Sequence, residues 1–455
     1  MLLETPTVLD LKAHFNGRVI EPDDALYDEA RTIFYGGFDR RPAAIIRAAD
    51  ANDVARVVSL ARESGMELAI RAGGHSVAGH SASEGGLILD LSEMKGLEID
   101  VEGRTAWAEA GLTAEEYTIA AAQHGLATGF GDTGTVGIAG LTLGGGVGFL
   151  VRKYGLTIDD LLAAEIVTAD GQIRHINANN YPDLFWAIRG GGGNFGVVTR
   201  FKFRLHEVDT IVGGILILPA TAETITAFIA EAEAAPEELS TIANVMAAPP
   251  MPFFPPEAHG KLIIMAMMVY AGDVEDGQRV VGRFRALADP IADMVRPMSY
   301  PEMYPPEEGG FHPLAVGRTM FVEHIDRSTA ETILDHLQRS TAMMRVAQLR
   351  VLGGAIARVP ADATAYAHRT AKIMLNTAAL YGPPDEGPVH EAWVTNFAAA
   401  LEQGDDGAYV NFLSNEGDVR AAYPGRTWDR LRAIKRQYDP TNLFRLNHNI
   451  PPAQE

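Results

Sequence analysis

The chain has 455 residues, 47% of them hydrophobic and 21% charged, which is the composition of a compact folded protein with two domains or more. Its 59 Asp and Glu outnumber its 38 Lys and Arg, and the net charge of −21 argues against nucleic acid and anionic membrane surfaces as partners, because both would repel the chain. The sequence contains no cysteine, so disulfide bonds, thiolate metal sites and a catalytic cysteine are excluded.

The N-terminal stretch MLLETPTVLDLKAHFNG carries acidic residues early and lacks a long apolar core, so it does not predict a signal peptide. No apolar run reaches the roughly 18 residues that a transmembrane helix needs. The longest apolar stretches, such as residues 262–271, are typical of a buried strand instead. We therefore expect a cytoplasmic location.

Residues 39–100 alternate between strand and helix patterns. PAAIIRAA predicts a short buried strand, and the following segment predicts a helix that Asp50 or Asn52 caps and Gly65 ends. MELAIRAGG and GGLILDLSEM predict two further strands. Strand, helix and strand in this order form a crossover unit, so this region should contain a small α/β layer.

Residues 125–148 contain 10 glycines in 24 residues, with Thr, Val and Leu between them. A flexible linker would be polar throughout, whereas this segment keeps apolar residues. Glycine here predicts a backbone that passes close to a flat or charged ligand. Glycine-rich turns without a ligand are the alternative.

Residues 154–208 return to strands. LLAAEIVTADGQIRHI predicts a hairpin that turns at Asp170–Gly171. The later run GGGGNFG has the G-x-G-x-x-G spacing of dinucleotide sites, at Gly191, Gly193 and Gly196. That fingerprint needs a strand before it and a helix after it, whereas here a helix-like DLFWAIR precedes and a strand-like VVTRFKF follows. The run therefore does not predict a Rossmann site.

Residues 210–405 alternate between strands and longer amphipathic helices, and we interpret them as a second domain whose sheet lies over the first. Proline clusters at 248–260 and 301–313 predict long surface loops. The segment contains no internal repeat.

His75 follows a glycine pair in RAGGHS, and His80 lies five residues later. A zinc site would need further ligands, but only Glu84 and Asp90 are near, without a recognisable spacing. No G-x-S-x-G elbow accompanies either histidine, so a serine hydrolase is not predicted. These residues alone indicate neither a metal centre nor a hydrolase.

Three segments carry a resemblance to a known family. RAGGHSVAGHSASEGGLILDLSEMKG (71–96) resembles the phosphate-binding loop of the flavoproteins related to vanillyl-alcohol oxidase, and more narrowly of the berberine bridge enzyme-like group of FAD-linked oxidases. Residues 131–162 are similar to the second flavin stretch of that family, and YDPTNLFRLNHNIPP (438–452) to its C-terminal signature. The resemblance covers nearly the whole chain and is weakest between 210 and 350.

The resemblance implies FAD as the cofactor. In the family the histidine of R-x-G-G-H is joined to the 8α carbon of the flavin, which maps onto His75, and the backbone amides of Arg71–Gly74 would wrap the pyrophosphate. Many members have a second link through a cysteine, but Thr133 occupies that place here, so His75 alone should hold the flavin. A loop histidine beside noncovalent FAD is the alternative.

The residues that we expect against the cofactor are Arg71, Ala72, Gly73, Gly74, His75, Ser76, Thr133, Gly134, Val136, Gly137, Gly140, Gly144, Gly145, Gly148, Val197, Asn447 and Asn449. Capping of a turn is an alternative for the two asparagines. Other candidates for the substrate pocket, each of which could equally be core or surface, are Tyr300, Tyr304, His312, His324 and Trp393.

The resemblance also suggests a catalytic base. AYVNF is similar to a family segment whose tyrosine serves as base, which points to Tyr409, while Leu375 or Asn376 stands where berberine bridge enzyme itself has a glutamate. A phenol titrates near pH 10, so Tyr409 needs a cation, hydrogen bonds or the oxidised flavin nearby to act at neutral pH. Packing in a strand is the alternative for this tyrosine. Val136 falls where relatives control oxygen access, and valine there resembles the oxidases.

Together these features predict an α+β, two-domain flavoprotein. A bipartite FAD-binding domain of the PCMH type would span 1–208 and 406–455, and a substrate domain with an antiparallel sheet covered by helices would span 209–405. We expect an FAD-dependent oxidase that takes a hydride from a C–H next to O or N of a sugar, alcohol, amine or phenolic metabolite and gives H2O2 from O2. A dehydrogenase of the same fold and a non-catalytic flavin-carrying protein are the alternatives. We expect no metal, nucleic acid or membrane partner, and the oligomeric state stays open.

Overall fold

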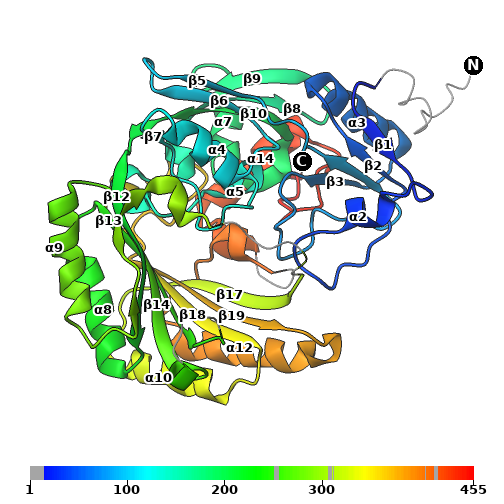
Figure 1. The fold of residues 1–455 in the computed structure, drawn as a ribbon. Coiled ribbons are helices and arrows are strands. Elements are labelled where there is room, and N and C mark those ends of the chain that lie inside the picture. The colour runs from blue at the N-terminus through cyan, green and yellow to red at the C-terminus, as the bar shows by residue number, and fades with distance from the viewer. Residues whose placement is uncertain are drawn as a thin grey trace, which may run out of the picture.

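The computed structural model describes residues 15–250, 256–305, 310, 312–404, 406–414 and 419–454. The chain forms two lobes (Figure 1): the upper one contains small sheets from the N-terminal half together with the C-terminal segment, and the lower one contains a large sheet covered by helices. This arrangement confirms the predicted α+β fold class. The exact domain boundaries stay a prediction.

The first small sheet has the strand order β1-β2-β4-β3. Its strands are β1 (Arg18–Ile20), β2 (Ala44–Arg47), β3 (Leu68–Arg71) and β4 (Leu87–Asp90). Strands β2, β4 and β3 are parallel, and α3 (Ala51–Ser64) connects β2 to β3. Asp50 accepts the amide hydrogens of Asn52 and Asp53, and Gly65 adopts the left-handed conformation (φ 70°) that ends the helix. The predicted crossover unit is confirmed, with Asp50 as its cap.

The second small sheet is antiparallel with the order β5-β6-β10-β8-β9. Its strands are β5 (Leu97–Asp100), β6 (Thr105–Glu109), β8 (Leu161–Val167), β9 (Ile173–Asn177) and β10 (Val197–Arg204); β7 (Leu126–Ala127) and β11 (His206–Glu207) form a separate pair. Strands β8 and β9 form the predicted hairpin, with Gly171 at φ 78° in its turn. Helix α7 (Pro182–Ile188) precedes the glycine run and β10 follows it, so the Rossmann context is absent from this segment.

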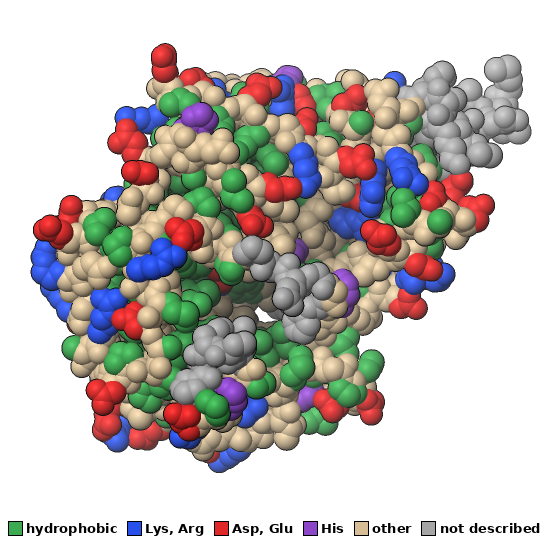
Figure 2. Space-filling model, viewed as in Figure 1, with side chains coloured by type: hydrophobic (Ala, Val, Ile, Leu, Met, Phe, Trp, Pro, Cys, Tyr) green, Lys and Arg blue, Asp and Glu red, His purple; other side chains and the backbone are tan. Residues whose placement is uncertain are grey.

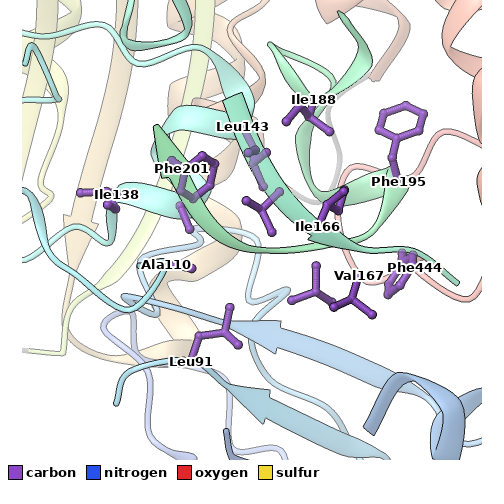
Figure 3. Packing of buried hydrophobic residues seen from close by; sticks show 14 of the residues in the cluster. Leu91, Ala110, Ile138, Leu143, Ile166, Val167, Ile188, Phe195, Phe201 and Phe444 are labelled. Atoms are coloured by element: carbon purple, nitrogen blue, oxygen red, sulfur yellow. The ribbon is translucent and has the colours of Figure 1, made fainter. Parts of the chain in front are cut away.

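The core of the upper lobe joins segments that are far apart in the sequence. Figure 3 shows Phe195 and Val167 close to Phe444, which comes from the C-terminal segment. All three side chains are buried in one cluster. The last part of the chain is therefore built into the hydrophobic core of the lobe that contains its beginning.

The large sheet has eight antiparallel strands in the order β15-β12-β14-β13-β18-β19-β17, with β16 beside β12. They are β12 (Thr210–Pro219), β13 (Leu239–Ala247), β14 (Leu262–Tyr270), β15 (Ala292–Asp293), β16 (Arg296–Ser299), β17 (Leu314–Val322), β18 (Met344–Val351) and β19 (Ile373–Tyr381). Helices α8 (Ala222–Ala234), α9 (Val274–Arg285), α10 (Arg327–Arg339) and α12 (Gly387–Leu401) lie outside it (Figure 1). Phe228, Phe284 and Phe397 from three of these helices share one core with the sheet.

The described part of the chain contains further helices and 3-10 turns. They are α2 (Tyr27–Arg31), α4 (Ala114–Ala122), α5 (Ile138–Gly144), α6 (Val151–Tyr154), α11 (Ala355–Arg358), α13 (Val419–Ala422), α14 (Arg426–Tyr438) and the 3-10 turns η1 (Thr157–Asp159), η2 (Gly192–Phe195), η3 (Pro256–Ala258), η4 (Tyr300–Met303), η5 (Pro384–Glu386) and η6 (Val410–Phe412). None of the helices in the described part of the chain has the length and apolar character needed to cross a membrane. The cytoplasmic location stays a prediction.

One predicted surface loop is partly wrong. The proline-rich segment at 301–313 begins in a 3-10 turn, and Tyr300 and Tyr304 are buried beside Phe149 and Leu150 of the upper lobe. The aromatic side chains thus pull this part of the loop into the contact between the lobes. Residues 251–255, 306–309 and 311 of the two proline-rich segments lie outside the described residues.

Candidate active site

The two predicted cofactor segments meet backbone to backbone. A Cβ atom added to Gly73 would lie 2.3 Å from the amide nitrogen of Gly137, and one added to Gly137 would lie 2.4 Å from the nitrogen of Gly73. Real Cβ atoms do not approach so closely, so any side chain at either position would separate the segments. The loop at 71–76 and the glycine stretch at 131–148 therefore form one continuous floor.

His75 lies where these two segments join. Its ring stacks on Phe34, with 4.2 Å between the centroids, and its Nε2 is 3.1 Å from the Thr135 hydroxyl. Burial lowers the pKa of His75 to about 4. The imidazole is therefore neutral at physiological pH and keeps a nitrogen lone pair that can form a bond.

The side chain of Arg71 has a structural role. Its guanidinium donates to Asp90 at 2.8 Å, and Asp90 also accepts from Arg47 at 3.2 Å. Arg71 can therefore offer the floor only its backbone, and the contact of that backbone with a pyrophosphate stays a prediction. Gly74 follows at φ 71°, a left-handed conformation that favours glycine.

The glycines of the second segment differ in what surrounds them. Gly140 faces open space, with no atom within 4 Å of the position that a Cβ would take, whereas a Cβ at Gly144 would lie 1.9 Å from Asn411 Oδ1 and one at Gly148 would lie 1.4 Å from the Phe130 carbonyl. Gly145, at φ 134°, would place its Cβ 3.2 Å from the Tyr366 ring. Protein packing thus explains the glycines at 144, 145 and 148, while their contact with a cofactor stays a prediction.

The remaining predicted cofactor residues lie along the same floor. Thr133 and Val136 are half-buried, and Gly134 and Val136 accept amide hydrogens from helix α4 through their carbonyl groups. Ser76 accepts the His80 amide hydrogen at 3.3 Å, and Ala72 lies against Gly137. Val197 begins β10 and is buried. The structure places these residues together but does not test their roles.

Tyr409 is buried and hydrogen-bonded. Its hydroxyl accepts the Gly146 amide hydrogen and an Asn411 amide hydrogen, both at 2.9 Å. It precedes the η6 turn and does not lie in a strand. Burial raises the pKa of Tyr409 above its usual value, and it outweighs the opposing effect of the two donors and of Arg350.

The C-terminal segment reaches the floor through Asn194, the asparagine of the glycine run. Its Oδ1 accepts the Ile450 amide hydrogen at 2.9 Å, and its Nδ2 donates to the His448 carbonyl at 3.1 Å. The buried ammonium of Lys435 donates to the Asn194 carbonyl at 2.7 Å and pairs with Asp439 at 2.7 Å. The glycine run therefore fastens the C-terminal segment.

This fastening brings the C-terminal residues beside the first loop. The rings of His448 and His80 lie 4.8 Å apart, edge to face, and burial lowers their pKa values to about 4 and about 3. Asn447 and Asn449 each hold a buried Oδ1 that has no hydrogen-bond partner. Because buried acceptors are normally paired, these two oxygens are suited to a ligand that donates hydrogen bonds.

The residues present therefore fit FAD. The floor requires glycine where two backbones touch, a neutral imidazole stands at its edge, and two unpaired asparagine oxygens lie on the segment beside it. Backbone amides of the loop can bind a diphosphate, and the asparagines can accept from the N–H of a heteroaromatic ring.

The large sheet faces this floor with its uncovered side. Arg350 of β18 donates to the Val147 carbonyl at 3.1 Å and to Asp132 at 2.5 Å, and it also donates to Gln348. Its guanidinium lies 5.3 Å from the Phe412 ring centre. Arg350 is thus a buried bridge between the sheet and the glycine stretch, and the sequence contained no signal that distinguished it from the other polar residues of the strand, Arg345 and Gln348.

The other candidate pocket residues separate into three groups. Tyr304 donates to the Gly131 carbonyl at 2.9 Å within the core between the lobes, together with Tyr300. His312 contacts the carbonyl of Ile33 at 3.0 Å, close to the His75 loop. His324 is exposed, and Trp393 belongs to α12 on the helix side of the sheet. The last two are therefore outside the site.

A surface cavity of about 670 Å³ lies elsewhere. Its lining includes Arg104, Arg204, His206 and Glu207. Arg104 pairs with Glu207, and His206 binds Asp160 at 2.7 Å, so the charges named here compensate one another. This cavity shares no residue with the floor. In the described ranges, no three His, Asp or Glu side chains gather as metal ligands.

Comparison with known proteins agrees with this geometry. A family model described as a FAD binding domain matches residues 42–177, and one described as berberine and berberine-like matches residues 408–451. The (R)-6-hydroxynicotine oxidase of Paenarthrobacter nicotinovorans is 31% identical over 456 residues, which cover 96% of this chain and 97% of that one. The xylooligosaccharide oxidase of Thermothelomyces thermophilus is 28% identical over 91% of this chain and 88% of its own. The crystal structure of 6-hydroxy-D-nicotine oxidase from Arthrobacter nicotinovorans has a TM-score of 0.85 and 27% identity, covering 99% of this chain and 100% of that one.

Fold, site and relatives together define an FAD-dependent oxidoreductase. The chain belongs to the berberine bridge enzyme-like family of FAD-linked oxidoreductases, within the vanillyl-alcohol oxidase superfamily. The predicted family, cofactor and enzyme class are confirmed, and a small-molecule substrate follows from them.

Proposed function

We propose that this protein is an oxidase that removes a hydride from a C–H bond next to O or N of a small molecule and uses O2 as acceptor, giving H2O2. The observation that carries the proposal is the position of His75, neutral and at the junction of two glycine segments, below a sheet face with polar side chains. When bound, FAD accepts the hydride and later passes two electrons to the acceptor. The protein supplies position, a proton acceptor and control of access.

His75 is proposed as the single covalent attachment point of the flavin. Because its pKa is about 4, it needs no deprotonation before its nitrogen forms a bond. Phe34 on one ring face and Thr135 at Nε2 hold the imidazole in one orientation. A second covalent link through cysteine is excluded, because the chain has none.

Oxygen as acceptor is supported by Val136 and by the names of relatives. Val136 is a short, half-buried side chain on the floor, where it leaves more room than a larger aliphatic residue would. The two relatives described above are named oxidases. A dehydrogenase of the same fold would restrict oxygen at this place.

The acceptor is tested by reoxidation in a stopped-flow instrument. We expect the dithionite-reduced, FAD-loaded protein to recover its oxidised spectrum within seconds after mixing with air-saturated buffer. The same experiment with Val136→Leu should be slower, because the larger side chain fills the space beside the floor. Wild-type reoxidation over hours would identify a dehydrogenase instead.

Tyr409 is proposed as the proton acceptor for the substrate heteroatom. Its hydroxyl oxygen receives two N–H groups, which would stabilise the phenolate, and Arg350 adds positive charge. Since burial keeps the pKa above the usual 10.0, the base is protonated at pH 7. Only the deprotonated form accepts a proton, so the rate should rise continuously with pH over the neutral and alkaline range.

Tyr409→Phe should slow anaerobic flavin reduction by at least about tenfold and remove this rise with pH. The matched control is Tyr366→Phe, which removes a buried hydroxyl that has no hydrogen-bond partner on a ring 6.2 Å from Tyr409. The control should keep both the rate and its pH dependence. An unchanged profile in Tyr409→Phe would place the base elsewhere.

A further inference from the structure

The uncovered face of the large sheet is partly exposed along its strands. In β18, Ala347 and Leu349 face the helices and are buried, whereas Val346 and Gln348 face the other way and are partly exposed. Strand β14 shows the same alternation, with Met265 partly exposed and Ala266 buried. Figure 2 shows the molecule hollowed between its upper and lower parts, with hydrophobic side chains near the hollow. This inner face therefore lines a space between the lobes.

The register of the strands aligns one row of side chains across the inner face. Thr319 lies opposite Asn376, Asn376 opposite Gln348, and Gln348 opposite Asn244. Since Arg350, two residues after Gln348, reaches Asp132 and Val147 in the floor, this row faces the floor as well. We call these four residues the polar row: Asn244, Thr319, Gln348 and Asn376.

Two members of the polar row are satisfied and two are not. Gln348 donates to Asn244 Oδ1 at 2.9 Å and accepts from Arg350 at 2.8 Å. Asn376 Oδ1 and Thr319 Oγ1 are buried atoms without a hydrogen-bond partner. An unpaired buried acceptor destabilises the protein, so these two atoms indicate the place where a ligand donates a hydrogen bond.

The rest of the inner face is apolar. The row continues from Asn244 to Met265 and Ile217, and a cluster beside it contains Ile215, Met246, Met344 and Val346. Methionine is flexible and packs well on flat rings. The positive charge that faces this space from β18, Arg350, is compensated by Asp132. A neutral, mostly apolar ligand matches this wall better than an ion.

We propose that the substrate is a neutral, largely apolar ring compound with one hydroxyl or N–H group, which donates to Asn376 Oδ1 and contacts the Thr319 hydroxyl while the rings lie on the methionine-rich cluster. This inference rests on the proposed function of the same site. An oligosaccharide does not fit, because its many hydroxyl groups would lie against methionine and isoleucine without partners.

The test uses anaerobic titrations of the FAD-loaded protein, followed by the shift of the flavin absorption bands that a bound ring causes. The probes are 2-naphthol, 2-methoxynaphthalene and cellobiose. The two naphthalenes differ in that only 2-naphthol has a hydroxyl that can donate a hydrogen bond. We expect 2-naphthol to bind about tenfold more tightly than its methyl ether, because the ether leaves Asn376 unpaired. Cellobiose should cause no shift at concentrations at which 2-naphthol saturates.

Asn376→Leu should abolish the preference for 2-naphthol, so that the two naphthalenes bind about equally tightly, because the acceptor is gone while the apolar wall remains. Thr377→Val is the matched control: Thr377 is the next residue, its hydroxyl also lacks a partner, and it points to the opposite side of the sheet. The control should keep the tenfold preference.

Three results would overturn the inference: saturation by cellobiose, no binding of either naphthalene, or an unchanged preference in Asn376→Leu. None of them depends on oxygen or turnover. Slow reoxidation in air would contradict the oxidase proposal and leave this binding result standing, so the two failures are distinguishable.

Discussion

His75→Ala should release all of its flavin when the protein is precipitated with acid, whereas the wild-type pellet should stay yellow. The reason is local: the imidazole at the junction of the two glycine segments is neutral and held by Phe34 and Thr135, and no cysteine is present to keep a second link. The measurement is flavin absorbance in the supernatant and in the redissolved pellet. The change from full retention to full release is an all-or-none effect.

The matched control for this variant is His80→Ala. His80 lies in the same loop and is also buried, but its ring meets His448. We expect its flavin to remain in the acid pellet. Trypsin cleaves after Arg71 and Lys95, so mass spectrometry of peptide 72–95 provides a second readout. A wild-type peptide without added mass, from fully yellow protein, would refute the covalent link.

Arg350→Met should lower the free energy of unfolding of the flavin-loaded protein by about 3–5 kcal/mol, the usual cost of removing one partner of a buried ion pair. The substitution keeps an apolar side chain but leaves Asp132, Gln348 and the Val147 carbonyl without their donor. Urea unfolding monitored by tryptophan fluorescence measures the loss. The bridge between the sheet and the floor would be broken.

Two further variants separate the bridge from a general effect of losing charge. Adding Asp132→Asn to Arg350→Met should recover part of the loss, because the uncompensated carboxylate is removed. Arg327→Met, which removes an exposed arginine paired with Glu223 and Glu331, should leave the urea midpoint almost unchanged. Equal losses for Arg350→Met and Arg327→Met would contradict the proposed bridge.

Local signals explain why much of the upper lobe was predictable. Helix α3 begins after Asp50 and ends at Gly65, and the Asp170–Gly171 turn defines one hairpin. Neighbouring residues alone therefore determine these elements. The cofactor loop is predictable because it resembles a known family segment whose residues are contiguous in the sequence. Tyr304 lies inside the surface loop that the prolines of 301–313 predict, and it shows the limit: its burial between the lobes overrode the local pattern.

The polar row could not be predicted in the same way. Asn244, Thr319, Gln348 and Asn376 come from four strands, and only the pairing order β13-β18-β19-β17 brings them together. Each of these strands also carries other polar residues, such as Thr377 in β19 and Arg345 in β18, so the members of the row cannot be singled out without the register. The contact of Gly73 with Gly137 is non-local for the same reason.

The C-terminal segment that Asn194 fastens is translated after the strands of both lobes. Ile450 and His448 form hydrogen bonds with this asparagine, and Asn447 and Asn449 are their neighbours in the sequence. All four residues are translated later than β19, the last strand of the large sheet in the sequence. The two lobes therefore emerge from the ribosome and begin to fold while this segment is still missing. Because we predict that Asn447 and Asn449 contact the flavin, we expect flavin incorporation to follow the translation of residue 450, and a stop codon shortly before Asn447 to prevent it.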